Sequence, residues 1–410
     1  MVKRLRPAGM RALRGGYLTA LRVNGIDPPS RTARRLSVGH LILMLPSSLK
    51  PRTLIPYAET LLIAAVGGVA FTLIGVPAGL VSGSMLVTAV AALMGRPMKV
   101  PLPLARVCFV LIGILLGAVV TPATLRGIAT WPLSIAVLAV SSAVMIVATK
   151  GYLRLVHRWE PLSALLGASP GSMAQALALA AEFGANMRGI AIVQTMRVLL
   201  VTIGLPSGLA LFGLAASGIP PAPPGAGSSL AELAILVAVS TAGAVLVHWL
   251  RFPGGLLFGA MAASAVLHGA DVVHVTLPWW LGSSAVVLLG GLVGSRFANT
   301  SLAMLLEYFW AALGSAAVAI AVSAAFVLVV VSLSPFRASD VLIAFAPGAQ
   351  DTMMVLALAL HLDPVYVGAH HLTRFLIVTF SVALAARRLA RKSGMASSGE
   401  KRRRPGAFED

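Results

Sequence analysis

The stretch that decides the fold is ASPGSMAQALALAAEFGANMRGIAIVQTMR, residues 168–197, because the chain contains it in two versions. The second version, AFAPGAQDTMMVLALALHLDPVYVGAHHLTR, covers residues 344–374. Each version places a Pro-Gly pair inside an apolar run and an arginine in the next apolar run. A helix-breaking pair and a cation are both costly inside a bilayer, so their recurrence at matched spacing indicates an internal repeat.

Further matches place the repeat in register over most of the chain. VPAGLVSGSM at residues 76–85 corresponds to FPGGLLFGAM at residues 252–261, and Asn186 corresponds to Asp363. Each half also carries a glycine pair, Gly113 and Gly117 in the first half and Gly290 and Gly294 in the second. Small residues four positions apart permit close helix contact in lipid.

Composition predicts a membrane protein. The 410-residue chain is 58% hydrophobic and 11% charged, about half the charge of an average soluble domain. Apolar runs of about twenty residues recur along almost its whole length, which predicts several membrane-spanning helices. The single cysteine, Cys108, excludes a disulfide framework. No His, Cys or carboxylate cluster has metal-ligand spacing and no nucleophile motif is present, so we expect no metal, no cofactor and no enzyme activity.

The net charge of +19 is concentrated in the two tails. Residues 1–52 hold eleven Lys and Arg against one acid, and residues 383–410 hold eight against three. Basic residues beside membrane spans mark the cytoplasmic side and contact anionic lipid, so we expect both termini in the cytoplasm and a lipid rather than a nucleic-acid partner. The predicted organisation is a disordered basic extension (1–52), a first transmembrane repeat (53–214), a Pro/Gly linker (215–229), a second transmembrane repeat (230–386) and a basic cytoplasmic tail (387–410).

Two topologies remain open. If each Pro-Gly segment spans fully, each half has six spans and both halves point the same way. If each segment enters and returns on one side, each half has five full spans and the second half is inverted. The inverted arrangement leaves only Arg126 and Arg337 outside. The cations that it places inside are Arg96, Lys99, Lys150, Arg154, Arg158, Arg188, Arg251 and Arg296.

The positive-inside rule therefore favours inversion. We predict an all-α polytopic membrane protein of two inverted repeats, each of about five transmembrane helices with one broken or re-entrant Pro-Gly helix. Many secondary transporters are built in this way.

The two Pro-Gly breaks predict a ligand site. If they meet near the midplane, each leaves a half-helix N-terminus whose free N–H groups and dipole attract an anion. The alternative is a plain proline kink whose freed carbonyl is bonded by a neighbour. The candidate substrate-binding residues are Pro170, Gly171, Ser172, Gln175, Gln194, Arg197, Pro347, Gly348, Ala349, Gln350, Asp351, His371 and Arg374.

The charged candidates each have two interpretations. Arg197 and Arg374 lie too deep in their spans to reach the surface easily, so they either contact a substrate anion or a carboxylate, or cap carbonyls of the broken helices. Asp351 either titrates for proton coupling or pairs with one of these arginines. His371 lies three residues before Arg374 and shares its helix face, whereas His370 points about 100° away and is expected to face lipid or an interface.

The repeated Pro-Gly segment with its downstream arginine resembles the AbrB family of bacterial membrane proteins. The resemblance covers about residues 57–390, and its most specific part runs from Ala346-Pro347-Gly348 to the HHLTR motif at residues 370–374. It implies an inner-membrane protein with a duplicated hydrophobic domain and a link to regulation of gene expression. Some members carry the label ammonia monooxygenase, which this chain does not support because it lacks a copper- or iron-binding cluster.

We therefore expect a secondary transporter of a small organic anion or amphiphile, with a midplane site between inverted repeats. The alternative is a membrane-bound regulator acting through a cytoplasmic partner. The bacterial inner membrane is the expected location, and a homodimer is one candidate assembly.

Overall fold

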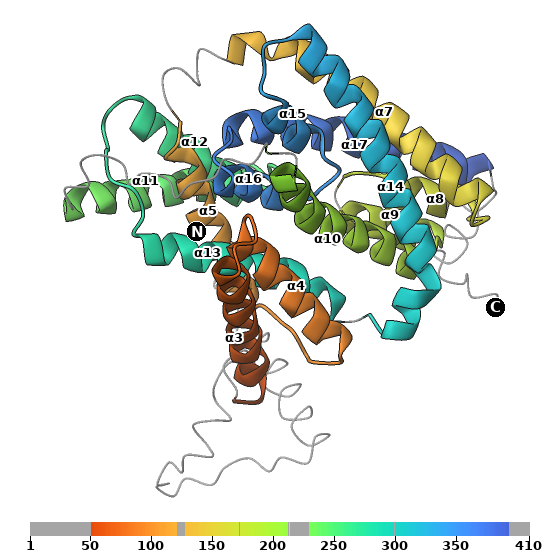
Figure 1. The fold of residues 1–410 in the computed structure, drawn as a ribbon, viewed down its shortest axis with the longest axis horizontal. Helices are drawn as coiled ribbons and strands as arrows, with labels where there is room; N and C mark the ends of the chain where they lie inside the picture. The colour runs from red at the N-terminus through yellow and green to blue at the C-terminus, as the bar shows by residue number, and fades with distance from the viewer. Residues whose placement is uncertain are drawn as a thin grey trace, which may run out of the picture. The chain divides into compact units, whose positions relative to one another are not determined.

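The computed structural model describes residues 51–120, 128–171, 173–211, 213, 229–298 and 300–392 (Figure 1). The chain divides into two units, Met1–Thr53 and Leu54–Asp410. Only the last three residues of the first unit are described, and they open helix α3. The helices described from residue 54 onwards belong to the second unit.

Every regular element in the described ranges is a helix. The first half contains α3 (Pro51–Leu73), α4 (Gly79–Leu93), α5 (Leu102–Gly117), η2 (Ile128–Thr130), α7 (Pro132–Leu155), α8 (Pro161–Ala168), α9 (Met173–Phe183) and α10 (Met187–Leu211). The second half contains α11 (Leu230–Trp249), α12 (Gly255–Gly269), α13 (Trp279–Gly294), η3 (Ser295–Phe297), α14 (Leu302–Leu333), α15 (Ala338–Phe345), α16 (Gln350–Ala359) and α17 (Pro364–Lys392).

The two halves repeat the same order of helix types. A long helix, two helices of 15 and 16 residues, a second long helix, a short broken pair and a third long helix follow one another in each half. The two helices of each broken pair are short because a Pro-Gly dipeptide interrupts the apolar run between them. The duplication that the sequence indicates is therefore visible in the helices themselves.

Seven of the described helices are long and apolar enough to cross a bilayer. They are α3, α7, α10, α11, α13 with η3, α14 and α17. Four shorter apolar helices, α4, α5, α9 and α12, lie between them. An all-helical chain with several membrane-compatible helices is what the composition predicts, and this part of the prediction is confirmed.

Two helices extend past the predicted boundaries of the repeats. Helix α3 begins at Pro51, within the stretch predicted as an extension, and α17 continues to Lys392. The end of α17, ARRLARK, consists of strong helix formers, so the helix has no reason to stop at residue 386. The linker segment 214–228 and Arg126 lie outside the described residues, and Ser229 caps α11 by accepting a hydrogen bond from the N–H of Glu232.

Glycines allow the two halves to pack closely against each other. On α5, a Cβ at Gly113 would stand 2.5 Å from the carbonyl oxygen of Leu257 on α12. On α13, a Cβ at Gly290 would collide with Ser84 on α4. These contacts are related by the repeat, because α5 packs on α12 as α13 packs on α4. The sequence match of the glycines thus reflects one packing contact that is made twice.

Helices α5 and α13 also touch at equivalent positions. The Cys108 thiol donates a hydrogen bond to the carbonyl of Ala285, 3.3 Å away and 177 positions later in the sequence. Further along, Leu115 is the neighbour of Gly282. The α5 residue number falls from 115 to 108 while the α13 number rises from 282 to 285, so the two equivalent helices run in opposite directions where they meet.

Candidate functional site

Each Pro-Gly dipeptide separates two short helices. Helix α8 ends at Ala168 and α9 begins at Met173, with Ser169 extended at ψ 121°. Helix α15 ends at Phe345 and α16 begins at Gln350, with Ala346 extended at ψ 137°. A residue before proline is pushed out of the helical region, so these extended residues follow from the sequence. Each break leaves carbonyls without an intrahelical partner at the end of the first short helix.

Arg197 bonds the freed carbonyls of the first break. From α10, its Nη1 donates to the carbonyl of Ala168 at 3.4 Å, and its Nη2 donates to that of Ser169 at 3.0 Å. The side chain is 3% exposed. Its Nε is buried without a hydrogen-bond partner among the described residues.

Arg374 bonds the freed carbonyls of the second break in the same way. From α17, its Nη1 donates to the carbonyls of Phe345 at 3.2 Å and Ala346 at 2.8 Å. The side chain is 2% exposed. Of the interpretations open to the two arginines, the carbonyl cap is the one that their hydrogen bonds display.

In each repeat a second side chain bonds one further carbonyl of the first short helix. Gln194 Nε2 donates to the carbonyl of Leu166 at 2.8 Å, and His371 Nε2 lies 3.0 Å from the carbonyl of Ile343. The Nδ1 of His371 lies 2.7 Å from Nη2 of Arg374 and must accept, because an arginine has only donors. His371 is therefore a neutral imidazole with its proton on Nε2. It bonds a carbonyl of the short helix α15, as Gln194 bonds a carbonyl of α8 in the first repeat.

One cavity of about 570 Å³ joins the two breaks. Of the predicted site residues, those on its wall are Pro170, Gly171, Gln194, Arg197, Gly348, Ala349, Gln350, Asp351, His371 and Arg374. Two others do not reach it. Pro347 is buried away from the cavity, and Gln175 turns to the carbonyl of Thr379 on α17, 3.0 Å away. Ser172 lies outside the described residues.

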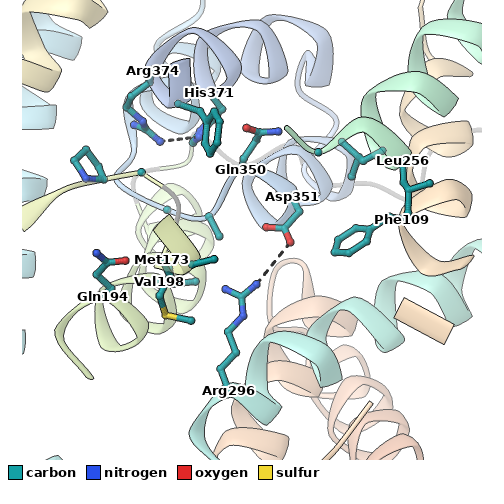
Figure 2. A pocket seen from close by; sticks show the side chains of 18 of the residues that line it. Phe109, Met173, Gln194, Val198, Leu256, Arg296, Gln350, Asp351, His371 and Arg374 are labelled. Atoms are coloured by element: carbon teal, nitrogen blue, oxygen red, sulfur yellow. Dashed lines mark hydrogen bonds and ion pairs between the residues drawn. The ribbon is translucent and has the colours of Figure 1, made fainter. Parts of the chain in front are cut away.

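Asp351 pairs with an arginine that sequence reasoning assigned elsewhere. Its Oδ2 lies 4.0 Å from Nη2 of Arg296, which follows α13 (Figure 2). Of the two interpretations of Asp351, proton coupling stays a prediction, and the arginine that it pairs with among the described residues is Arg296 in place of Arg197 or Arg374. Its Oδ1 accepts the N–H of Thr352 in the first turn of α16, where a carboxylate also complements the helix dipole. The inverted topology places Arg296 among the cations on the cytoplasmic side.

The rest of the cavity wall is largely apolar, and sequence reasoning missed it. Phe109 and Leu256 lie across from Met173 and Val198 in Figure 2. The other missed wall residues include Thr195, His248, Phe252, Leu257 and Phe375. An apolar residue in an apolar span carries no signal of its own, since only the packing of α5, α10, α12 and α17 brings these side chains together.

His370 does not face lipid or an interface. The ring is fully buried, its Nδ1 lies 2.8 Å from the carbonyl of Tyr366, and its Nε2 lies 2.9 Å from Oγ of Ser134. The ring centroids of His370 and Tyr366 are 4.0 Å apart. The expectation failed because α17 packs on α7 along this face, which the helical angle alone does not reveal.

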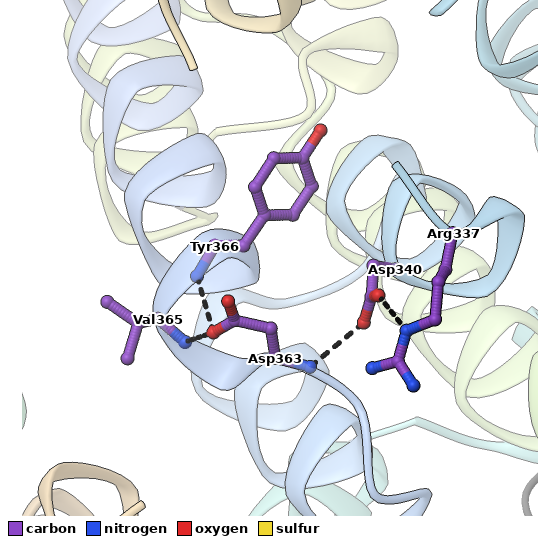
Figure 3. Close-up of polar contacts among 5 residues, drawn as sticks. All are labelled: Arg337, Asp340, Asp363, Val365 and Tyr366. Carbon is purple, nitrogen blue, oxygen red and sulfur yellow. Dashed lines mark hydrogen bonds and ion pairs between the residues drawn. The ribbon is translucent and has the colours of Figure 1, made fainter. Parts of the chain in front are cut away.

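A polar cluster ties the start of α15 to the start of α17 (Figure 3). Arg337 Nε donates to Oδ2 of Asp340 at 2.8 Å, and the N–H of Asp363 donates to its Oδ1 at 2.9 Å. Oδ1 of Asp363 accepts the N–H groups of Val365 and Tyr366 and so caps α17. Burial raises the pKa of the Asp363 carboxyl above 3.8, although these N–H groups and Arg337 oppose the rise.

The first repeat builds the same connection from less charged groups. The N–H of Asn186 donates to Oγ of Ser163 at 3.0 Å, and Ser163 donates to Oε2 of Glu160 at 3.0 Å. Oδ1 of Asn186 accepts the N–H of Gly189. Each broken helix is thus held at its outer end by this cluster and at its break by an arginine, which fixes the geometry of the cavity from both sides.

Comparison with known proteins identifies the family. The family model described as "Transition state regulatory protein AbrB" matches residues 80–390. The uncharacterized protein YhjN of Bacillus subtilis strain 168 is 25% identical over 350 residues, covering 77% of this chain and 88% of YhjN. A protein of Escherichia coli strain K12, provisionally named regulator AbrB, is 26% identical over 336 residues, covering 79% of this chain and 92% of that protein. The family match spans most of the chain and includes both Pro-Gly breaks and both arginines, and this chain belongs to the AbrB family.

Proposed function

We propose that this chain is a secondary transporter of a small organic anion or amphiphile, and not an enzyme. The observation that carries the proposal is a pair of buried, repeat-related arginines on the wall of one cavity. Among the described residues neither Arg197 nor Arg374 has a carboxylate partner. A buried charge without a counter-ion is expensive in a membrane protein, and such charges mark substrate or ion pathways. An anion in the cavity would supply the missing counter-charge.

Inverted repeats are part of this proposal, and two contacts support them. The equivalent helices α5 and α13 run in opposite directions where Cys108 meets Ala285 and Leu115 meets Gly282. Equivalent residues that touch lie beside the axis that relates the repeats. If these two helices lie across the bilayer, the axis that relates them lies in the plane of the membrane, which is the arrangement of many transporters with alternating access.

The transport proposal is tested by counterflow in proteoliposomes. Vesicles loaded with unlabelled adipate or hexanoate should accumulate the labelled form of the same anion when they contain the wild-type protein. Arg374→Met should abolish accumulation, because it removes the positive charge from the cavity wall. Arg388→Met is the matched control, since Arg388 lies exposed on the same helix. Unchanged accumulation by Arg374→Met would remove the basis of the proposal.

The topology is tested by labelling single cysteines. Cys108 is buried and is the chain's single cysteine, so Cys108→Ala provides a cysteine-free background. In that background Ala222→Cys, in the linker, should react with a membrane-impermeant maleimide from the outside of intact cells. Five spans before the linker require this result if the N-terminus is cytoplasmic in a bacterial inner membrane. Labelling only after the cells are opened would contradict inversion.

A membrane-bound regulator is the second candidate, favoured by the regulator name of the Escherichia coli relative. Deleting residues 1–50, which leaves α3 complete, separates the two functions. A transporter should keep its counterflow activity, whereas a regulator acting through this basic segment should lose its effect on gene expression.

A further inference from the structure

The formal charges on the cavity wall do not balance. The wall carries three arginines, Arg197, Arg296 and Arg374, and one carboxylate, Asp351. Three positive charges and one negative charge leave +2. Arg296 and Asp351 already form an ion pair with each other, so the excess lies on Arg197 and Arg374. Both guanidinium groups belong to residues on the wall of this one cavity.

The two histidines of the wall do not change this count. His371 donates from Nε2 to Ile343 and accepts at Nδ1 from Arg374, and this bonding requires the neutral ring. His248 is exposed and counts as neutral in the formal charge at pH 7. At pH 7 the cavity wall therefore carries a formal charge of +2 and is otherwise mostly apolar.

We propose that the cavity is selective for an organic dianion with an apolar middle, an inference that rests on the transport function proposed above. Two negative charges bring the sum to zero, whereas a single charge would leave one arginine uncompensated in a low-dielectric site. The carbonyl caps leave further guanidinium N–H groups, among them the Nε of Arg197, which has no hydrogen-bond partner among the described residues and can donate to a carboxylate or phosphate group. Phe109, Leu256 and Phe375 offer apolar contact to the part of the ligand between its charges.

The Arg296–Asp351 pair makes the charge count adjustable without disturbing either arginine cap. Arg296→Gln lowers the sum to +1, and Asp351→Asn raises it to +3. The double substitution returns it to +2. The fold should tolerate all three, since the Arg296 side chain is 30% exposed, the ion pair is long, and asparagine can still accept the N–H of Thr352.

The test compares two six-carbon probes, adipate with two carboxylates and hexanoate with one. Their dissociation constants are measured by isothermal titration calorimetry on the purified full-length protein at pH about 8, where unperturbed histidines are neutral. Wild-type protein should bind adipate at least about tenfold more tightly than hexanoate. Arg296→Gln should lose that preference, Asp351→Asn should keep it, and the double variant should recover it.

Recovery of the adipate preference in the double variant would distinguish an effect of the total cavity charge from an effect of direct contact between the ligand and Arg296 or Asp351. If the sum of charges sets selectivity, the double variant resembles the wild type although it lacks both side chains. Asp363→Asn, an acid-to-amide change at the cap of α17, is the control and should leave the ratio unchanged. A wild-type preference for hexanoate, binding of neither probe, or an unchanged ratio in Arg296→Gln overturns the inference. In the last case both anions still bind and the transport proposal stands, since that proposal is tested separately by counterflow.

Discussion

Arg197 and Arg374 occupy one position in two copies of the same structure. They are 177 residues apart, and each donates to the carbonyls that lie 28 and 29 residues before it. A guanidinium group can bond two carbonyls while keeping its charge, so each arginine closes a broken helix and makes the cavity positive. Under the proposed function, stability and ligand binding would therefore depend on the same atoms.

Arg374 can be used to separate those two roles. Arg374→Lys keeps the charge but loses the fork, and Arg374→Met loses both. We expect Arg374→Met to destabilise the protein by about 1–3 kcal/mol for each carbonyl left without a donor, and Arg374→Lys to fall between it and the wild type. Thermal unfolding in detergent measures this, with Arg388→Met as the exposed control. Equal melting temperatures for the two Arg374 variants would contradict a role for the fork.

His371 should be replaceable by the residue that the first repeat uses. His371→Gln retains an N–H donor for the carbonyl of Ile343, as Gln194 has for Leu166. His371→Leu leaves that buried carbonyl unbonded, at a cost of about 1–3 kcal/mol. We expect His371→Gln to keep near wild-type stability and counterflow, and His371→Leu to lose stability. Loss of counterflow in a stable His371→Gln protein would instead indicate that the imidazole itself takes part in transport.

Gly113 should not accept even one methyl group. Gly113→Ala places a Cβ 2.5 Å from the carbonyl oxygen of Leu257, and the helices must separate at a cost of about 1–3 kcal/mol. Gly151→Ala is the matched control, because Gly151 lies in helix α7 with no atom within 4 Å of an added Cβ. That change should be neutral or stabilising, since alanine is the better helix former. Similar melting temperatures for the two variants would show that α5 and α12 are less tightly packed than described.

Asp363 should make stability depend on pH. Its folded-state pKa lies above 3.8, so the ionised carboxylate is less favourable in the folded protein than in the unfolded chain. This penalty is complete above the folded-state pKa and disappears as pH falls through that value towards 3.8. Asp363→Asn keeps the cap on α17 and removes the titration. Melting temperatures between pH about 7 and pH about 4 should therefore rise less on acidification in Asp363→Asn than in the wild type.

Asp363→Ala provides the comparison for the cap itself. It leaves the N–H groups of Val365 and Tyr366 without their acceptor, and a lost helix cap costs about 1 kcal/mol. The alanine variant should be less stable than the asparagine variant at every pH. If the two variants are equally stable, the side chain does not cap α17.

The all-helical fold class, the internal repeat and the two helix breaks could all be predicted from the amino-acid sequence. Apolar runs of spanning length force a chain into membrane helices, and a proline inside such a run removes a backbone donor wherever the chain goes. The matched arginines could be found for the same reason, because a cation in an apolar run is conspicuous without any structure. Each of these features involves neighbouring residues or recurs at a fixed offset in the chain, so each can be recognised in the linear sequence.

Which residues line the cavity together became visible only once the helices were packed against one another. The pairing of Asp351 with Arg296, the burial of His370 against Ser134, and the place of Phe109 on the cavity wall all join residues from different helices. The direction in which a helix face points depends on the helices that pack against it. Helix α5 packs on α12 through glycines, and the spacing of these glycines in the sequence does not predict which helix they will contact. Helix packing brings distant positions together through contacts that no single segment specifies, which is why the charge balance of the cavity could not be counted from the sequence.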